Sequence, residues 1–323
     1  MQDYIDQRLK KIIKKIIQNN EAKSLLIAIS GGQDSICLIK LIEKIKEEIL
    51  YNKIEYIYID HQWKKNSRIQ IEHIIKYCKK LKINLSIYQI KKITLSENIA
   101  RRYRYHTLIN HAIIYRYKTI ITAHTKTDKL ETFIYNLIRG TGIEGIKGLN
   151  LYRKVNSKIS ILRPLIYENR LKINFFCRKW FLPIWSDTTN YNYHIIRNRI
   201  RHEIFPYIKK YLNKNFEKNI INFLYNFHYD NEYIKQQAFK IYLKIKHNKY
   251  IAIKTDCIKK QHIALQVKIL QLFIYHNFYI IITKKLLFNL IVNVYNIDDC
   301  KYIYYKNIIF CINDQWIYIK IKY

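Results

Sequence analysis

All six glycines of this 323-residue chain lie in two short stretches, residues 30–35 and 139–148. Elsewhere even the turns are made without glycine, mostly with Asn, Asp and Lys. Glycine reaches positive φ, and lets a ligand touch the backbone, without steric cost. A chain this poor in glycine is expected to keep it where backbone geometry leaves no substitute. These two stretches are therefore where we look for the chemistry.

The chain is strongly basic, with 58 Lys and Arg against 24 Asp and Glu and a formal net charge of +34. Such a charge favours a polyanionic partner, above all nucleic acid. Ile, Lys, Asn and Tyr abound while Gly, Ala, Pro and Arg are scarce, which is typical of A/T-rich coding sequences. Part of the charge and many of the 30 tyrosines therefore reflect base composition. We expect RNA rather than DNA as the partner, but not from charge alone.

The six cysteines are scattered without a C-x-x-C pair, which argues against an iron–sulfur cluster, a zinc ribbon or a thioredoxin-like redox pair. Cys37 and Cys78 fall on apolar helix faces and are expected to be core thiols in a reducing compartment. No apolar run approaches the roughly 18 residues of a membrane span. The N-terminus resembles neither a signal peptide nor a transit peptide. We expect no membrane association. The base composition favours the plastid stroma, with the cytoplasm of a reduced bacterium as the alternative.

Apolar patterning predicts strands that alternate with helices. A lysine-rich helix over 4–20 comes first. Short apolar runs predict strands at 24–29, 54–59, 83–90 and 119–123, and helical spacing predicts helices at 36–50, 68–81, 97–117 and 129–139. This alternation predicts an α/β fold with a doubly wound parallel sheet, whose ligands bind beyond the carboxyl ends of the strands.

The second part of the chain is organised differently. The three prolines, Pro164, Pro183 and Pro206, are expected to mark the change. From about residue 207 the pattern is helical, and residues 299–323 alternate as two strands. We therefore predict a catalytic domain over 1–206, followed over 207–323 by a helical connection and a second, smaller mixed α/β domain.

The first glycine stretch, S-G-G-Q-D-S at 30–35, follows a buried strand and opens a helix. This arrangement directs backbone N–H groups and a helix N-terminus at an anion. The Gly-Lys-Ser/Thr of P-loop NTPases and the G-x-G-x-x-G of dinucleotide folds are both absent. A capping turn alone would account for Asp34 or Ser35, but not for two adjacent glycines. The pattern resembles the pyrophosphate loop of enzymes that split ATP into AMP and pyrophosphate.

Four further segments narrow this resemblance. They are I-D-H-Q-W-K-K-N-S at 59–67, E-N-I-A-R-R-Y-R-Y at 97–105, T-A-H-T-K-T-D-K-L-E-T at 122–132 leading into L-I-R-G-T-G at 137–142, and D-T-T-N at 187–190 with R-N-R-I-R at 197–201. In this order and spacing they resemble the tRNA(Ile)-lysidine synthases, in their shorter form, over residues 24–206. That family belongs to the PP-loop ATP pyrophosphatases, with an adenine-nucleotide alpha-hydrolase-like sheet.

The resemblance implies a two-step reaction on an isoleucine tRNA with the anticodon CAU. ATP, with Mg²⁺, adenylates the 2-carbonyl oxygen of the wobble cytidine and releases pyrophosphate. The ε-amino group of free L-lysine then attacks that carbon and expels AMP. The lysidine that results reads AUA instead of AUG. The small C-terminal domain is expected to contact the tRNA.

The nucleotide ligands are expected in the first loop and at two strand ends. The residues assigned to the nucleotide are Ser30, Gly31, Gly32, Gln33, Asp34, Ser35, His61 and His124. Asp34 would hold Mg²⁺ and act in catalysis, because a carboxylate beside triphosphate oxygens needs a cation between them. The alternative for Asp34 is a first-turn acid favoured by the helix dipole, and for the histidines a structural role.

Asp128 and Glu131 lie three apart on one predicted helix and so share a face. Such a carboxylate pair suits the amino groups of the lysine substrate, and one member can take a proton as the amine attacks. A capping pair or a solvated acidic face is the alternative. Arg197 is expected to face the lysine carboxylate, because a bidentate guanidinium is its natural partner.

Four arginines, Arg101, Arg104, Arg199 and Arg201, are expected to contact the tRNA, with an ordinary basic helix face as the alternative. The second glycine stretch is expected to let the backbone approach the unstacked cytosine or the adenylate. Its alternative is a helix C-cap at Gly140. Three positions, Lys64, Thr127 and Lys129, depart from the family pattern, which leaves any second metal ion open.

Two other functions stay open from the residues alone. The first is another enzyme built on the same loop, a tRNA thiolase or an amidotransferase-type synthetase. A thiolase would need paired or sulfur-carrying cysteines, which are missing. The second is a non-catalytic RNA-binding protein, which should have lost Asp34 or a loop glycine. The oligomeric state is open, with a homodimer among the alternatives.

Overall fold

The structure is a computed structural model. It describes residues 7–8, 10–16, 24–48, 51, 53–62, 67–91, 96–146, 148–185, 193–296 and 300–321. The chain divides into two compact units, Met1–Ile221 and Asn222–Tyr323. The division falls inside helix α10 (Phe216–Ile245), downstream of residue 206, where the sequence predicts the first domain to end.

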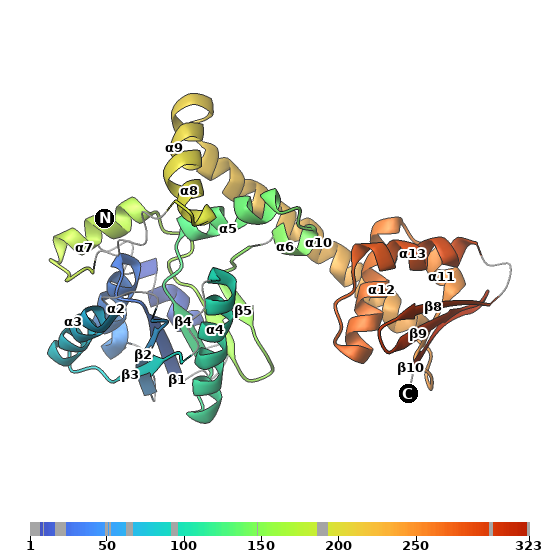
Figure 1. Cartoon of the computed structure of the whole chain (residues 1–323), viewed down its shortest axis with the longest axis horizontal. Helices are drawn as coiled ribbons and strands as arrows, with labels where there is room; N and C mark the ends of the chain where they lie inside the picture. Colours follow the sequence, from blue (N-terminus) through green and yellow to red (C-terminus); the bar gives the residue numbers. More distant parts are fainter. Residues whose placement is uncertain are drawn as a thin grey trace. The chain divides into compact units, whose positions relative to one another are not determined.

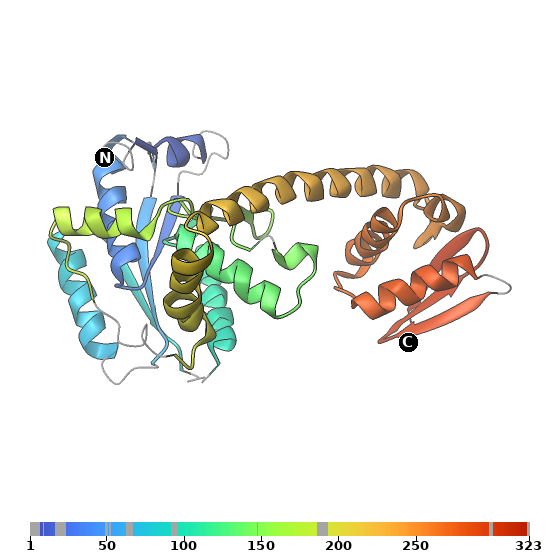
Figure 2. The ribbon, with the colours of Figure 1, turned by 90° about the horizontal axis from the view of Figure 1, so that it is seen from above.

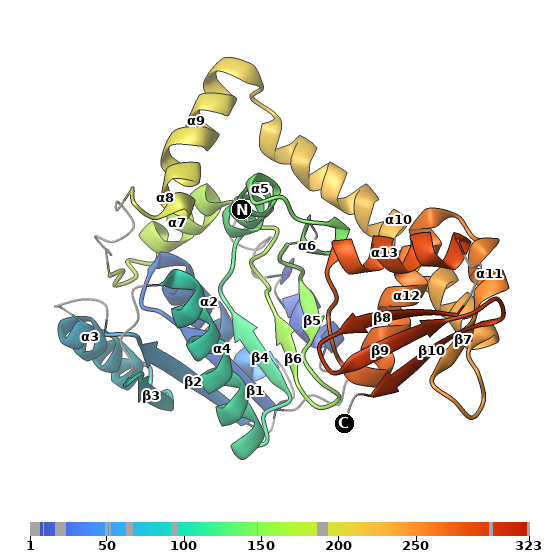
Figure 3. The same cartoon turned by 45° about the vertical axis from the view of Figure 1, so that its right-hand side comes forward.

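The first unit is built on a six-stranded sheet in the order β3-β2-β1-β4-β6-β5. Its strands are β1 (Ser24–Ile29), β2 (Lys53–Asp60), β3 (Leu85–Gln89), β4 (Thr119–Thr122), β5 (Tyr152–Lys154) and β6 (Ser160–Leu162). All pair in parallel except β5, which is antiparallel to β6. The predicted doubly wound parallel sheet is confirmed, and the strand order can be followed in Figure 3. The order reverses beside β1, so the ends of β1, β2 and β4 meet at the position where such sheets bind ligands.

Helices cover both faces of this sheet (Figures 1 and 2). The helices α2 (Gln33–Ile45), α3 (Ser67–Lys80) and α7 (Arg170–Lys179) pack on one face. The helix α4 (Glu97–Ile114) packs on the other. Neighbouring residues of β1 pack into the cores on opposite faces of the sheet. Ile27 packs with α2, α3 and α7, and Leu26 packs with α4, which explains the unbroken apolar run of this strand.

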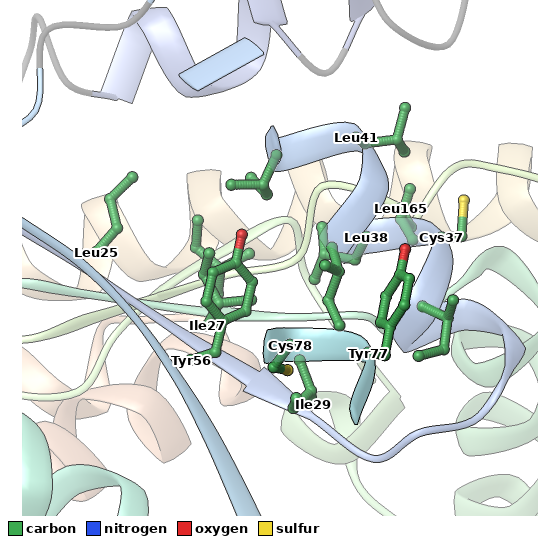
Figure 4. Packing of buried hydrophobic residues seen from close by; sticks show 14 of the residues in the cluster. Leu25, Ile27, Ile29, Cys37, Leu38, Leu41, Tyr56, Tyr77, Cys78 and Leu165 are labelled. Atoms are coloured by element: carbon green, nitrogen blue, oxygen red, sulfur yellow. The ribbon is translucent and has the colours of Figure 1, made fainter. Parts of the chain in front are cut away.

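The larger core packs β1 against α2 and α3 (Figure 4). Cys37 and Cys78 are buried in it, as predicted, and all six cysteines are free thiols. α7 also packs on this core and lies between Pro164 and Pro183. The α/β organisation therefore continues past Pro164, contrary to the expectation that this proline marks the change of organisation.

The segment 196–212 is a helix interrupted by two π-helical turns. The helix α8 (Ile196–Arg199) continues through a π-helical turn (Ile200–Ile204), the short α9 (Phe205–Tyr207) and a second π-helical turn (Ile208–Leu212). Pro206 fits because it stands in the first turn of α9. Ile200 and Phe205 pack with Leu130 of α5 (Lys126–Ile138), which fixes this segment against the sheet domain.

The second unit contains a four-stranded antiparallel sheet in the order β7-β10-β9-β8. Its strands are β7 (Ala252–Lys254), β8 (Lys301–Tyr305), β9 (Ile308–Ile312) and β10 (Trp316–Ile321). The helices α11 (Thr255–Lys259), α12 (Ile263–Phe278) and α13 (Lys284–Tyr295) pack with it in one core. The first of the two predicted strands is thus a hairpin, whose turn uses Lys306 at a φ of 53°. No helix in the described part of the chain is long and apolar enough to cross a membrane.

Candidate active site

A pocket of about 790 Å³ opens at the carboxyl ends of β1, β2 and β4 in the first unit. The loop after β1, the residues that follow β2 and β4, and parts of α4, α5 and the 195–202 segment line it. This is the position predicted from the alternation of strands and helices. The volume suits a nucleotide-sized ligand.

Most of the residues predicted for the site come together in this pocket. Those that line it are Ser30, Gly32, Gln33, Asp34, His61, Arg101, Arg104, His124, Asp128, Glu131, Arg197 and Arg201. Gly31, Ser35 and Arg199 are not among its lining residues. Arg199 is exposed and pairs with Glu203, one helical turn away, at 2.9 Å. Lys64 and residues 187–190 lie outside the described residues.

Gly31 and Ser35 shape the loop from behind. Gly31 has a φ of +75°, and a Cβ there would come within 2.8 Å of the Ile74 side chain on α3. The Ser35 hydroxyl oxygen accepts a hydrogen bond from the Ser30 backbone N–H at 3.0 Å. From α3, the Gln70 amide donates to the Ser30 carbonyl oxygen at 2.8 Å. The loop is therefore held in one shape by the first unit's own core.

Gly32 differs from its neighbour. It lines the pocket, its φ of −73° is open to any residue, and a Cβ there would meet nothing nearer than the Ser30 hydroxyl at 3.7 Å. The fold therefore does not require glycine at position 32. What the missing side chain leaves open is space on the pocket side of the loop.

Asp34 is a carboxylate with an unused oxygen. Its Oδ1 is buried and has no hydrogen-bond partner among the described residues. Its Oδ2 lies 3.8 Å from Nη2 of Arg170, at the start of α7. Burial raises the pKa of Asp34 to about 6, an effect that Arg170 opposes and Asp128 reinforces. A buried carboxylate oxygen without a donor, beside a phosphate-type loop, is a fitting ligand for a hard cation such as Mg²⁺.

Arg201 binds the predicted carboxylate pair. Both oxygens of Glu131 accept hydrogen bonds from it, Oε1 from Nε and Oε2 from Nη2 at 3.0 Å. The same Nη2 lies 3.3 Å from Oδ1 of Asp128. Burial raises the pKa of Glu131 to about 7, against the attraction of Arg201. The sequence assigns Arg201 to RNA phosphate, but the structure places it inside the pocket on two carboxylates.

The π-helical turn explains this placement. Arg201 belongs to the turn Ile200–Ile204, whose extra residue per turn changes which side chains face inward. Arg197, predicted to meet the lysine carboxylate, also lines the pocket, and its guanidinium lies 5.6 Å from the centre of the Tyr135 ring.

Asp128 both caps α5 and lines the pocket. Its Oδ2 accepts hydrogen bonds from the Thr125 N–H at 2.7 Å and from the Thr125 hydroxyl at 3.0 Å. Burial would raise the pKa of Asp128, but the hydrogen bonds from Thr125 and the positive charge of Arg201 hold it below its usual range. Asp128 therefore stays ionised in conditions where Glu131 takes up a proton. Two carboxylates with such different proton affinities can serve different roles in one site.

His124 is held neutral. Burial and the nearby guanidinium groups of Arg163, Arg101 and Arg104 lower the pKa of His124, and Asp128 only partly offsets them. The Thr122 hydroxyl lies 2.8 Å from its Nδ1 and fixes the ring. A neutral imidazole at the end of β4 can donate or accept a hydrogen bond but carries no charge for a phosphate.

Among the lining residues without a predicted role, three contact or adjoin the predicted site. Arg170 was missed because the apolar pattern did not predict α7. Asp60 ends β2, and its Oδ2 is buried without a hydrogen-bond partner among the described residues. Gln70 lines the pocket and braces the loop. By contrast Lys129, one of the departures from the family pattern, is buried over the Tyr167 ring at 4.9 Å and is not a lining residue.

The second glycine stretch ends a helix. Gly140 has a φ of +72°, the Thr141 N–H donates to the Asn136 carbonyl at 3.2 Å, and the Gly140 N–H donates to the Leu137 carbonyl at 3.0 Å. This is a Schellman motif after α5, so the C-cap alternative is confirmed. No described glycine of this stretch lines the pocket. The expectation that it brings backbone to the substrate base therefore loses its support.

Comparison with known proteins agrees with this geometry. The PP-loop domain family matches residues 2–208. The chain is 44% identical, over 85% of its length and 86% of the relative's, to the chloroplastic tRNA(Ile)-lysidine synthase of Gracilaria tenuistipitata var. liui. It is 34% identical to the chloroplastic enzyme of the same name from Pyropia yezoensis, over 83% and 82% of the two chains.

Among solved structures the chain is similar to the U34-tRNA thiolase NcsA from Methanococcus maripaludis with its 4Fe-4S cluster. The TM-score is 0.54 at 15% identity, over 69% of this chain and 80% of that one, which shows a shared fold. The thiolase is a distant PP-loop relative, whereas the much closer curated relatives carry one name. The chain belongs to the tRNA(Ile)-lysidine synthase family, the ATP-dependent ligases of the PP-loop proteins.

Proposed function

We propose that this protein attaches free L-lysine to carbon 2 of the wobble cytidine of tRNA(Ile) with the anticodon CAU. The observation that carries the proposal is one pocket that combines a phosphate-type loop with a carboxylate pair already bound to a cationic side chain. The relatives that match most of the chain are named for this product. Their chloroplastic names also favour the plastid stroma as the place of action.

The loop side of the pocket serves the first step. Ser30, Gly32 and Gln33, which line the pocket, would bind the phosphates, and Asp34 would hold Mg²⁺, which neutralises phosphate charge when bound. The 2-carbonyl oxygen of cytosine attacks the α-phosphorus of ATP. The bond from that phosphorus to its bridging oxygen breaks, and pyrophosphate leaves. Arg170, beside Asp34, is positioned to attract the departing negative charge.

The carboxylate pair serves the second step. The ε-amino nitrogen of lysine bonds to carbon 2, the bond from carbon 2 to the adenylate oxygen breaks, and AMP leaves. The amine must lose a proton as it attacks. Glu131, with a pKa of about 7, is matched to accept this proton near neutral pH, while the ionised Asp128 attracts the substrate's positive charge. Arg201 now occupies both carboxylates, so the lysine would displace or share its contacts.

The tRNA contacts divide between the pocket and the outer surface. Arg101 and Arg104 line the pocket, where they can meet the phosphates that flank the unstacked cytidine. Arg199 is exposed outside the pocket, where it would contact RNA phosphate. Arg197 keeps its proposed role toward the lysine carboxylate.

The test is a reconstitution with ATP, radiolabelled lysine and unmodified tRNA(Ile). We expect label in the RNA and the release of AMP and pyrophosphate in equal amounts. A tRNA(Ile) transcript with another base at the wobble position serves as the control and should stay unlabelled. ATP cleavage that depends on a sulfur donor would move the protein to the thiolases. RNA binding without any ATP turnover would make it a binding protein.

A further inference from the structure

The four-stranded sheet of the second unit has one face that its helices do not cover. Alternate strand residues, among them Ile253, Phe310 and Ile317, enter the core beneath α12 and α13. The residues between them face the other way, because successive side chains of a strand point to opposite faces. These outward residues are Ala252, Lys254, Tyr302, Tyr304, Ile309, Cys311, Trp316, Tyr318 and Lys320, of which the small Ala252 and Cys311 side chains are buried. We call them the outer face.

The outer face presents aromatic rings in register. Tyr302 pairs with Cys311, which pairs with Tyr318, so one row crosses three strands. Tyr304, Ile309 and Lys320 form the next row. Tyr302 is 54% exposed and Tyr304 is 68% exposed. The rings of Trp316 and Tyr318 on β10 are partly exposed and lie 6.4 Å apart, centre to centre, and the Trp316 ring also contacts the His247 ring at 4.9 Å. Residues two apart on a strand are separated by about 7 Å, so the rings form a spaced platform.

The charge of the outer face is positive. The four strands contain no acidic residue, and Lys254 and Lys320 stand among the rings. The Lys254 ammonium lies 5.7 Å from the centre of the Trp316 ring. Across residues 222–323 fifteen lysines face six acidic residues. A second copy of this chain would bring like charge against like charge, which disfavours self-association through this face.

We propose that the outer face binds unpaired RNA nucleotides by stacking their bases on Tyr302, Tyr304, Trp316 and Tyr318. The bases of a duplex are paired and stacked on one another, so their faces are not open to a protein. Unpaired bases can stack on aromatic side chains while lysines contact the phosphates. The occupant is a single-stranded segment of the tRNA substrate. This inference rests on the proposed function only for the identity of that RNA.

The alternative is that these tyrosines reflect strand propensity and A/T-rich coding alone. The test compares full-length wild type with the double variant Tyr302→Thr/Tyr304→Thr. Threonine, which is β-branched, also favours strands, and it removes the ring. The probes are a fluorescent single-stranded RNA of about twelve nucleotides and a duplex of the same length, measured by anisotropy at one fixed salt concentration.

We expect the double variant to bind the single strand at least about tenfold more weakly, since each stacked base contributes roughly 1–3 kcal/mol. Duplex binding should change less than about twofold. The variant Tyr302→Phe/Tyr304→Phe should restore single-strand binding, because stacking needs the ring and not the hydroxyl. Two control variants, Tyr275→Ala on exposed helix surface and Ile321→Thr on β10, should bind as wild type.

Equal single-strand affinity of the Thr variant and wild type, with both folded by thermal melting, would overturn the proposal. The proposal would also be overturned if the Thr variant differed from wild type in sedimentation coefficient but not in RNA affinity. The outer face would then join two copies of the chain. Lysine attachment by the wild type is measured in parallel. If wild type attaches lysine and the Thr variant binds RNA normally, only the outer face is refuted. If wild type attaches no lysine but the Thr variant loses RNA, only the proposed function is refuted.

Discussion

The two units of this chain carry different residues for the anionic partner that we propose. Every glycine and every arginine lies in the first unit, at or before Arg201, and the second unit relies on lysine and tyrosine. Arginine offers a rigid fork of donors, and lysine a mobile point charge. Some of these scarce residues stand where geometry has to be fixed, such as Gly31 in the loop and Arg201 on the carboxylate pair. The pocket of the first unit is therefore shaped by such residues, whereas the outer face proposed for RNA presents lysines and aromatic rings.

The arginines of the first unit show what that geometry requires. Arg201 binds both oxygens of Glu131, and Arg163 is fully buried with its Nη1 donating to the Asn150 carbonyl at 2.9 Å. Neither arrangement suits a single ammonium group. In the second unit the charged partners of the rings, such as Lys254 over Trp316, need only proximity.

The largest effect is expected at Asp34. Asp34→Asn keeps the shape of the side chain but removes the charge that would hold the cation, so ATP–pyrophosphate exchange should fall at least about a hundredfold. Binding of tRNA should change less than about twofold. The matched control is Asp230→Asn, an exposed acid in the second unit, which should exchange as wild type. Normal ATP–pyrophosphate exchange by Asp34→Asn would contradict the proposed cation site, and with it the assignment of the catalytic step to the first unit.

A smaller effect is expected at Glu131. Glu131→Gln removes the proposed proton acceptor and the charge that binds Arg201. We therefore expect kcat/KM for lysine to fall about ten- to a hundredfold. The KM for ATP should change much less. Glu203→Gln breaks the exposed pair with Arg199 and provides the control, because that pair lies outside the pocket. The measurement is steady-state kinetics with lysine and ATP varied in turn. Equal increases in KM for lysine and KM for ATP would contradict the assignment of Glu131 to the lysine step.

The sequence predicts the strands and the phosphate-type loop well because both are local patterns. β1 is an unbroken apolar run, and the loop follows it directly in the chain. The strands β5 and β6 were missed because three residues cannot show a period. The placement of Arg201 could not be predicted, since a π-helical turn shifts the helical phase and ordinary helical spacing gives the wrong face. Tertiary packing, and not local pattern, decides which side of a helix reaches the pocket.

The two loop glycines separate fold from binding within the first unit. Gly31→Ala should destabilise the protein by about 1–3 kcal/mol, because of its positive φ and the contact with Ile74. Gly32→Ala should leave the melting temperature unchanged and weaken ATP binding, since the added methyl group enters the pocket side of the loop. Thermal melting and nucleotide titration of both variants test this. Equal destabilisation by the two substitutions would contradict the division.

The smallest effect concerns pH and only the first unit. The folded protein holds protons on Asp34 up to a pKa of about 6 and on Glu131 up to about 7, above the usual range of unfolded carboxyls. Their contribution to stability is therefore full below about pH 4 and is lost as the pH rises through 6 and 7. Asp34→Asn imitates the protonated group, so without nucleotide it should match wild type at pH 4 and exceed its stability at pH 7.5 by on the order of 1–3 kcal/mol. Urea unfolding at both pH values measures this difference.

With Mg²⁺ and ATP added the order of stability at pH 7.5 should reverse, because the cation binds the ionised Asp34 and stabilises only the wild type. A variant that stays less stable than wild type at every pH, with or without nucleotide, would show that Asp34 acts in the fold and not in binding.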